Sequence, residues 1–220
     1  MKYRKFGQLD WQVSALGFGC MRLPQKRGTP GDGKIDVKSA TYQIRYAIDN
    51  GINYVDTAIP YHMGASEPFL SEALSDGYRE KVKLATKLPP WSVEKPKDMD
   101  ALLHAQLDRL NTEKIDYYLL HSLHRKSWEK MQSIGAREFL SRAKKDGLIQ
   151  NAGFSFHGLA EDFKGIVDDY DWTFCQIQYN FLDTQNQART SGLKYAAARD
   201  MAVMIMEPLR GGNLPKTPPP

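Results

Sequence analysis

Four residues of the types that move protons in enzymes follow short apolar runs of this sequence. They are an acid, a phenol, an amine and an imidazole, in chain order Asp56, Tyr61, Lys87 and His121. Each stands at or shortly after the carboxyl end of a run that is typical of a β-strand. Because neighbouring parallel strands of a barrel present their carboxyl ends at one rim, we expect the four side chains to meet there.

The chemistry of such a set is proton donation. A free phenol has a pKa of about 10 and gives up its proton poorly at neutral pH. The ammonium of Lys87 would lower the pKa of Tyr61, and the Asp56 carboxylate would supply the counter-charge that a buried ammonium needs. His121 could then hydrogen-bond the oxygen atom of a substrate. The set predicts a proton donor aimed at a carbonyl group that is being reduced.

Each residue also has a purely structural interpretation when it is taken alone. Asp56 could cap the turn that follows it, and Tyr61 could be an ordinary half-buried tyrosine. Lys87 could be solvated, and His121 could be a structural residue at a strand end. A chemical alternative is a Schiff base at Lys87, although Asp56 would keep that amine protonated and so oppose it. The joint position at consecutive strand ends favours the proton donor.

The elements that must position these residues alternate along the chain. Continuous apolar runs, typical of strands that are covered on both faces, occupy 16–21, 52–57, 82–86, 117–120, 152–156, 173–179 and 203–206. Amphipathic stretches between them predict six helices. The first has Asp36 as a possible N-cap and Gly51 as a stop, and the second has Ser66 as its cap. Strands separated by helices predict a parallel sheet.

Two arrangements of such a sheet are possible, a doubly wound sheet and a closed barrel. A dinucleotide-binding doubly wound sheet would carry Gly-x-Gly-x-x-Gly after its first strand, but residues 17–22 offer only Gly-x-Gly. We therefore predict an α/β fold, a (β/α)8 TIM barrel that is incomplete, with about seven strands. It forms one domain over residues 1–220 that lacks the last βα portion. An N-terminal β-hairpin around residues 7–10 would plug the amino-terminal mouth.

The composition excludes several classes of protein. The net charge of the 220 residues is only +4, with no block of like charge, so nucleic-acid binding is not expected. The two cysteines, Cys20 and Cys175, are far apart, which is typical of a reduced intracellular protein. No apolar stretch is long enough to span a membrane, and we expect a cytoplasmic location. Composition does not predict the oligomeric state.

Three motifs in register resemble the signatures of the aldo-keto reductase family. Asp56-Thr57-Ala58 is followed by Tyr61 and then by Ser66-Glu67, the residues 84–87 end in Lys87, and 116–121 end in His121. The resemblance extends from the opening hairpin to about Leu214. It implies a (β/α)8 barrel that reduces a small carbonyl substrate, an aldehyde or ketone, with NADPH, NADH being possible. It also implies that Asp56, Tyr61, Lys87 and His121 form the catalytic tetrad, and it implies no metal site.

The same resemblance implies a set of residues that bind the cofactor. Ser155 and Gln176 fall where the family holds the nicotinamide carboxamide, and the loop of the first strand and the loop after 203–206 fall along the cofactor. The full set is Gly19, Met21, Arg22, Asp56, Ser155, Gln176, Met206, Glu207, Pro208, Leu209 and Gly211. Two positions depart from the family. Phe156 stands where the family usually has Asn, and Met206 stands where it often has an aromatic residue.

The sequence is most similar to a longer branch of the family, some members of which add a carboxyl-terminal segment with iron–sulfur cysteines. We expect an iron–sulfur cluster only if such a segment exists. The eighth strand and the loop that grips the adenosine 2′-phosphate do not follow in these 220 residues. The alternatives to a reductase are therefore an NADPH-binding or NADPH-sensing module with little turnover, and an inactive fragment of a longer reductase.

Overall fold

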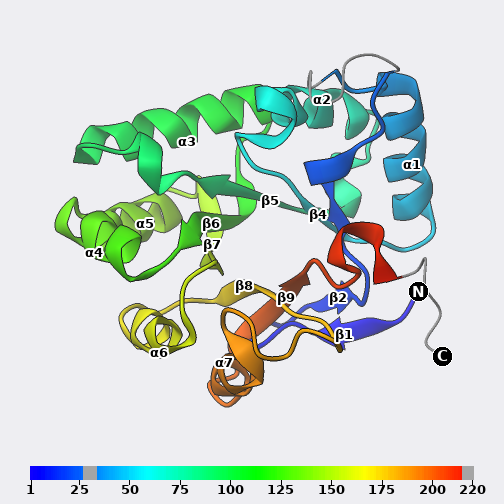
Figure 1. Cartoon of the computed structure of the whole chain (residues 1–220). Coiled ribbons are helices and arrows are strands. Elements are labelled where there is room, and N and C mark those ends of the chain that lie inside the picture. The colour runs from blue at the N-terminus through cyan, green and yellow to red at the C-terminus, as the bar shows by residue number, and fades with distance from the viewer. Residues whose placement is uncertain (27–33, 215–220) are drawn as a thin grey trace.

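The computed structural model describes residues 1–26 and 34–214, and its centre is a curled sheet of parallel strands (Figure 1). Each strand pairs with the next in chain order, so that β3 and β9 are the edges of the sheet among the described residues. The strands are β3 (Phe18–Gly19), β4 (Tyr54–Asp56), β5 (Lys83–Leu88), β6 (Ile115–Leu123), β7 (Ile149–Phe156), β8 (Phe174–Gln178) and β9 (Ala202–Met206). The predicted seven-stranded, incomplete barrel is confirmed.

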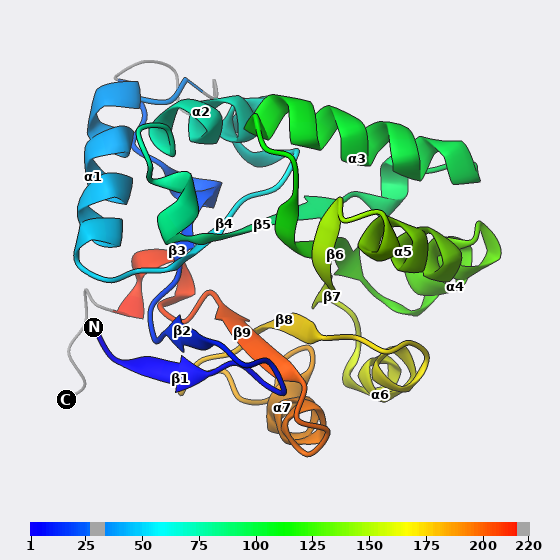
Figure 2. The ribbon, with the colours of Figure 1, turned by 180° about the vertical axis from the view of Figure 1, so that it is seen from behind.

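In the part of the chain that the structure describes, seven α-helices follow the strands and cover the outside of the sheet (Figures 1 and 2). They are α1 (Val37–Asp49), α2 (Ser66–Ala73), α3 (Pro96–Leu110), α4 (Arg125–Ser133), α5 (Ala136–Lys145), α6 (Ala160–Asp168) and α7 (Arg189–Ala197). The prediction of six helices missed α4, because this mostly polar helix buries only Trp128 and Met131 and so shows a weak apolar stripe. Within the described residues, every helix is too short or too polar to cross a bilayer.

Short 3₁₀ turns complete the loops on which several of the predicted site residues lie. They are η1 (Cys20–Arg22), η2 (Tyr61–Gly64), η3 (Arg79–Lys81), η4 (Pro90–Ser92) and η5 (Arg210–Gly212).

The strands from β4 to β8 are buried on both faces of the sheet, which is why they are continuous apolar runs in the sequence. Successive side chains of a strand point to opposite faces. In β6, Tyr118 and Leu120 pack into the large hydrophobic core beneath the helices. Tyr117 and Leu119 point the other way and belong to a smaller cluster inside the curl of the sheet. These two layers fix the register of the strands, since a shift by one residue would exchange the two faces.

The opening hairpin closes the amino-terminal mouth of the sheet, as predicted. Its strands, β1 (Tyr3–Lys5) and β2 (Gln12–Ser14), are antiparallel and lie beside β9 (Figures 1 and 2). Phe6 is buried and meets the Tyr117 ring edge-on, with the ring centroids 5.4 Å apart. Gly7 has a φ of +59°, and a Cβ there would lie 2.6 Å from the backbone of Ala202. A glycine therefore permits the hairpin to approach β9 this closely.

Two helix caps test the local predictions. Asp36 caps α1 as expected, because its Oδ1 accepts a hydrogen bond from the Ser39 amide at 3.2 Å, and Gly51 follows the helix with a φ of +95°. Ser66 does not cap α2, and that prediction was wrong. Its buried hydroxyl instead pairs with the Thr57 hydroxyl at 2.8 Å, which ties the start of α2 to the end of β4.

Candidate active site

Lys87 lies at the centre of the site, near the carboxyl end of β5, with only 1% of its side chain exposed. Its Nζ donates hydrogen bonds to Asp56 Oδ1 at 2.7 Å, to the Thr57 carbonyl at 2.8 Å and to Tyr61 Oη at 3.2 Å. These three acceptors use all three protons of the ammonium. The structure thus brings Asp56, Lys87 and Tyr61 into one hydrogen-bonded line across β4 and β5.

The backbone after β4 aims Tyr61 at this line. Tyr61 begins the turn η2, where His62 and Met63 have φ values of 52° and 54°. Such left-handed conformations are costly for side chains other than glycine, and they cluster at functional sites. The Tyr61 ring meets the His121 ring edge-on, with the centroids 6.2 Å apart. His121 comes from β6, so the four predicted side chains do gather at one rim.

The protonation of Tyr61 differs from the prediction. Burial raises the pKa of Tyr61 above its usual value, and the Lys87 ammonium opposes this shift without reversing it. The expected net lowering by Lys87 was therefore wrong for the protein alone, because the sequence does not reveal how strongly the phenol is desolvated. Tyr61 keeps its proton at neutral pH, which is the form that a donor requires.

Lys87 is held in its charged form. Burial lowers the pKa of Lys87, but the Asp56 carboxylate and the Tyr61 hydroxyl together outweigh it, and the net shift is upward. A protonated amine is not a nucleophile. The Schiff-base alternative is therefore disfavoured by the same contacts that hold the line of hydrogen bonds together.

His121 is neutral at physiological pH. Burial, followed by the charges of Lys87 and His157, lowers the pKa of His121 to about 3. Its Nδ1 is buried and has no hydrogen-bond partner among the described residues. A neutral imidazole carries one N–H, so His121 can offer a hydrogen bond to an oxygen atom without adding a second positive charge beside Lys87.

A buried polar network beneath the site fixes the strand that carries Lys87. Glu67 on α2, 1% exposed, accepts hydrogen bonds from Thr86 Oγ1 at 2.7 Å, Gln106 Nε2 at 2.8 Å and Arg109 Nε at 2.7 Å. Gln106 also donates to the Lys87 carbonyl at 3.1 Å. Sequence reasoning found Glu67 only as part of a motif and missed the other three. The available signal was Gln106, a polar residue inside the apolar stripe of α3.

Ser155 and Gln176 lie together on neighbouring strands, opposite each other in the register of β7 and β8. Gln176 Nε2 donates to Asp56 Oδ2 at 3.3 Å, and Ser155 Oγ accepts a hydrogen bond from the Ser122 amide at 2.7 Å. Each side chain therefore has a partner within the protein while keeping capacity for another, the Gln176 carbonyl and the Ser155 proton. Phe156, by contrast, is buried in the core and offers no polar group.

The other predicted cofactor residues form an exposed rim where the loop after β3 meets the loop after β9. The Arg22 guanidinium lies against Gly211, since a Cβ built on that glycine would be 2.4 Å from Arg22 Nη1. Arg22 has no hydrogen bond or ion pair within the described part of the chain. A Cβ on Gly19 would meet no atom within 4 Å, so the space before it is open. The remaining exposed rim residues are Met21, Glu207, Pro208 and Leu209, and Met206 ends β9 half-buried beside them.

This rim and the buried line of hydrogen bonds fit a nicotinamide dinucleotide. An uncommitted guanidinium suits a pyrophosphate, and the open space at Gly19 leaves room for the ligand. The sequence model of the Aldo/keto reductase family matches residues 15–218, which is nearly the whole chain. The chain belongs to the aldo/keto reductase family.

Individual members of the family resemble the chain over different parts. It is 30% identical over 165 residues to probable aldo-keto reductase 1 of Glycine max, covering 71% of this chain and 44% of that protein. It is 40% identical over 112 residues to methylglyoxal reductase YeaE of Escherichia coli strain K12, covering 51% of this chain and 36% of that protein. The matches thus span less than half the length of these two relatives.

A solved structure supports the fold over the whole chain. The aldo-keto reductase AKR11C1 of Bacillus halodurans, in its holo form, superposes with a TM-score of 0.82 at 27% identity, covering 100% of this chain and 70% of that one. Within the described residues of the present family member, no three His, Cys, Asp or Glu side chains gather as a metal site. Cys20 and Cys175 are both buried and free.

Proposed function

We propose that this family member reduces an aldehyde or ketone to an alcohol, with a hydride from NADPH and a proton from Tyr61. The observation that carries the proposal is the hydrogen-bonded line from Asp56 through Lys87 to Tyr61, with His121 edge-on to the phenol. A nicotinamide cofactor supplies the hydride for the carbonyl carbon when it is bound. The protein supplies the rest of the chemistry.

The roles of the four residues follow from their contacts. Tyr61 gives its proton to the carbonyl oxygen as negative charge develops on that oxygen. The phenolate left behind faces the Lys87 ammonium at 3.2 Å, and Lys87 is itself held by Asp56 at 2.7 Å. His121 orients the oxygen with its single N–H. The proton returns to Tyr61 from water after the alcohol has left.

The residues proposed to hold the cofactor divide into two groups. Ser155, Gln176 and Asp56 would meet the nicotinamide end, and Gly19, Met21 and Arg22 would line the dinucleotide together with the loop Met206–Gly211. NADPH is the proposed reductant and NADH the alternative. Separate fluorescence titrations with NADPH and with NADH give the Kd of each, and the cofactor with the lower Kd is the preferred reductant.

The test is Tyr61→Phe, assayed with methylglyoxal as the first substrate because a relative carries the name of a methylglyoxal reductase. We expect the rate of NADPH oxidation to fall by roughly 10² to 10⁴-fold, with a much smaller change in NADPH affinity. Tyr117→Phe, in the cluster at the opposite mouth of the sheet, is the matched control and should keep its rate. A Tyr61→Phe protein that reduces its carbonyl substrates as fast as the wild type would refute the proposal.

A further inference from the structure

The turn η2, which presents Tyr61, holds two consecutive residues in left-handed backbone conformations. His62 has φ and ψ of 52° and 43°, and Met63 has 54° and 35°, although neither is a glycine. Residues other than glycine keep such conformations only where their surroundings enforce them. The Ala65 amide donates to the His62 carbonyl at 3.0 Å, but this bond lies within the turn. A contact with another part of the chain is needed to fix the turn relative to the rest of the site.

The side chain of His62 makes such a contact. Its half-buried ring reaches the segment that follows β3, where Nε2 accepts a hydrogen bond from the Leu23 amide at 3.0 Å. Nδ1 lies 3.3 Å from the side-chain amide of Gln25, so both ring nitrogens meet this segment. Burial lowers the pKa of His62, and the Cys20 carbonyl opposes this shift without reversing it. The ring is therefore neutral at physiological pH and keeps a lone pair for the Leu23 amide.

The segment that His62 contacts is itself firmly placed and belongs to the site. Leu23 is 5% exposed and packs in the large core beneath the helices. The strand β3, directly before the turn η1, pairs with β4 so that Gly19 lies opposite Asp56. Between β3 and Leu23, η1 carries Met21 and Arg22, two of the residues proposed to line the cofactor. The His62 imidazole thus joins the turn that carries the proton donor to the loop that would line the cofactor.

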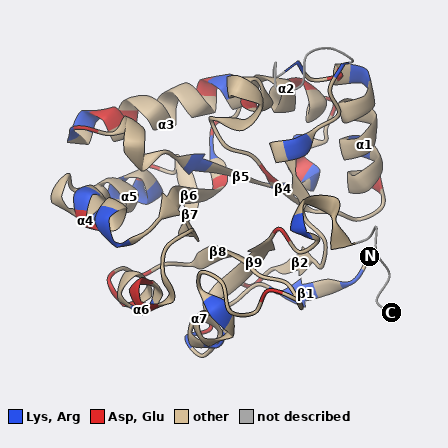
Figure 3. Ribbon diagram, in the orientation of Figure 1, with Lys and Arg blue, Asp and Glu red and all other residues tan. Residues whose placement is uncertain are grey.

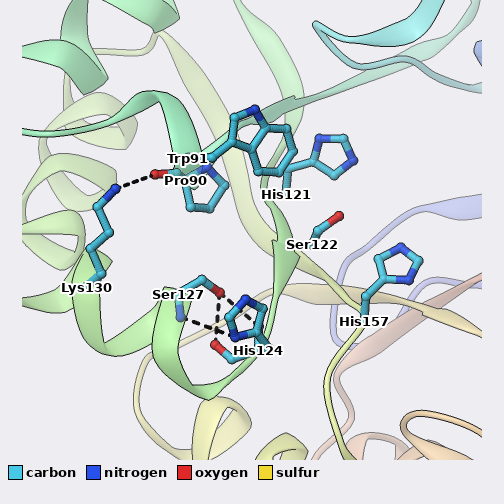
Figure 4. A pocket seen from close by; sticks show the side chains of 8 residues that line it. All are labelled: Pro90, Trp91, His121, Ser122, His124, Ser127, Lys130 and His157. Carbon is cyan, nitrogen blue, oxygen red and sulfur yellow. Dashed lines mark hydrogen bonds between the residues drawn. The ribbon is translucent and has the colours of Figure 1, made fainter.

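Neither an ion pair nor direct contact with a substrate replaces this role. The turn η2 contains no Lys, Arg, Asp or Glu, so no ion pair can tie it to η1. Many of the charged side chains lie on the helices outside the sheet instead (Figure 3). A cavity of about 300 Å³ adjoins His121, between Trp91 and His157, and His62 is not among the described residues that line it (Figure 4). His62 would therefore act on the reaction through Tyr61.

We propose that His62 is a positioning residue, and that its ring fixes the turn of Tyr61 relative to the cofactor loop η1. This inference rests on the proposed function and adds a residue to it. Without the ring, the turn and the loop should move independently. Proton donation would then slow, because small misplacements of a reacting group are costly to rate. Cofactor binding would weaken as well, because η1 would have to become ordered when the cofactor binds.

The experiment compares two substitutions that separate the ring of His62 from its backbone. His62→Gly removes the ring but relaxes the left-handed backbone, whereas His62→Gln keeps the strain and places an amide oxygen where Nε2 accepts from Leu23. We expect His62→Gly to slow single-turnover reduction of methylglyoxal at saturating NADPH by roughly 10- to 100-fold. It should also raise the Kd for NADPH by about three- to tenfold. His62→Gln should restore most of both losses.

Met63→Gly is the matched control, because it adds the same backbone freedom beside an intact ring. Met63 is 78% exposed, and this variant should keep the rate and the Kd of the wild type. Urea unfolding shows that each variant is folded. Hydrogen exchange of the Leu23 and Ala65 amides reports the loop and the turn without any need for activity. Protection of both amides should fall together in His62→Gly and be retained in His62→Gln.

The outcomes separate the positioning role from the proposed function. If His62→Gly keeps the rate and the Kd of the wild type, or if His62→Gln loses as much as His62→Gly, the positioning role is overturned. A rise in Kd without a loss of rate also overturns it, because the ring would then serve η1 alone. If the wild type reduces no carbonyl compound, the proposed function fails. The coupling then stands if His62→Gly raises the Kd and exposes both amides to exchange, and it is overturned if protection is unchanged.

Discussion

The two halves of the candidate site are built on opposite principles. The proton-transfer half is buried and fully hydrogen-bonded. The ammonium of Lys87 donates all three of its protons, to Asp56, Thr57 and Tyr61. The half proposed to bind the dinucleotide beyond its nicotinamide is an exposed rim, where Glu207 and Arg210 adopt φ values of 55° and 48°. The first half is organised before any ligand arrives, whereas the second leaves its cation, Arg22, without a partner among the described residues.

The two halves should therefore contribute differently to the free energy of unfolding. A buried ion pair depends on both members, because removing one leaves the other charge desolvated and uncompensated. An exposed arginine without a partner contributes little to folding and is available for a ligand. Substitutions in the first half should therefore cost stability and rate together, and those in the second should cost cofactor affinity alone.

The largest losses should come from Lys87→Met, which leaves the Asp56 carboxylate buried without its counter-charge. We expect the free energy of unfolding to fall by about 3–5 kcal/mol and carbonyl reduction to fall by roughly 10² to 10⁴-fold. Urea unfolding and steady-state rates measure the two losses. Lys83→Met on the same strand removes a half-exposed lysine whose partner, Asp116, keeps Arg79, and it should cost no more than about 1 kcal/mol. Equal losses in both variants would contradict the distinction.

The same contrast explains what the sequence could predict. Asp56, Lys87 and His121 were found because buried strands are short apolar runs, and a polar residue at the end of such a run stands out. The rise in the pKa of Tyr61 could not be found in this way, because desolvation depends on the packing of residues distant in sequence. Helix α4 was missed for a related reason, since a helix that buries only two side chains lacks a clear periodic stripe.

The rim was less accessible to sequence reasoning than the buried half. The contact between Arg22 and Gly211 joins two loops almost the length of the chain apart. A left-handed backbone at Glu207 and Arg210 is also not signalled by residue type, because such conformations usually favour Gly or Asn. Only the family resemblance pointed to these positions, and it did not reveal which of them carries an uncommitted charge.

An intermediate effect is expected from Arg22→Gln, which removes that charge. If the guanidinium meets the pyrophosphate, the Kd for NADPH should rise by about tenfold, or about 1.4 kcal/mol, while the free energy of unfolding stays within about 0.5 kcal/mol of the wild type. Fluorescence titration and urea unfolding report the two quantities. Arg4→Gln on the exposed hairpin, at the other mouth of the sheet, is the control. A loss of stability without a change in Kd would assign Arg22 to the fold and not to the cofactor.

His121 should make a smaller contribution, which is a dependence of the free energy of unfolding on pH. Its pKa in the folded protein is about 3, below the value of about 6.5 expected in the unfolded chain. Between these values the unfolded state binds more protons, so this residue makes stability rise with pH and fall as pH drops below about 6.5. From pH 7 to pH 6 His121 should account for a loss of about 0.7 kcal/mol, which is present in the wild type and absent from His121→Asn. His104→Asn, on the exposed face of α3, should retain the wild-type slope. If the free energy of unfolding changed with pH equally in wild type and His121→Asn, His121 would be solvated in the folded protein. The buried proton-transfer half would then comprise Asp56, Lys87 and Tyr61 without His121.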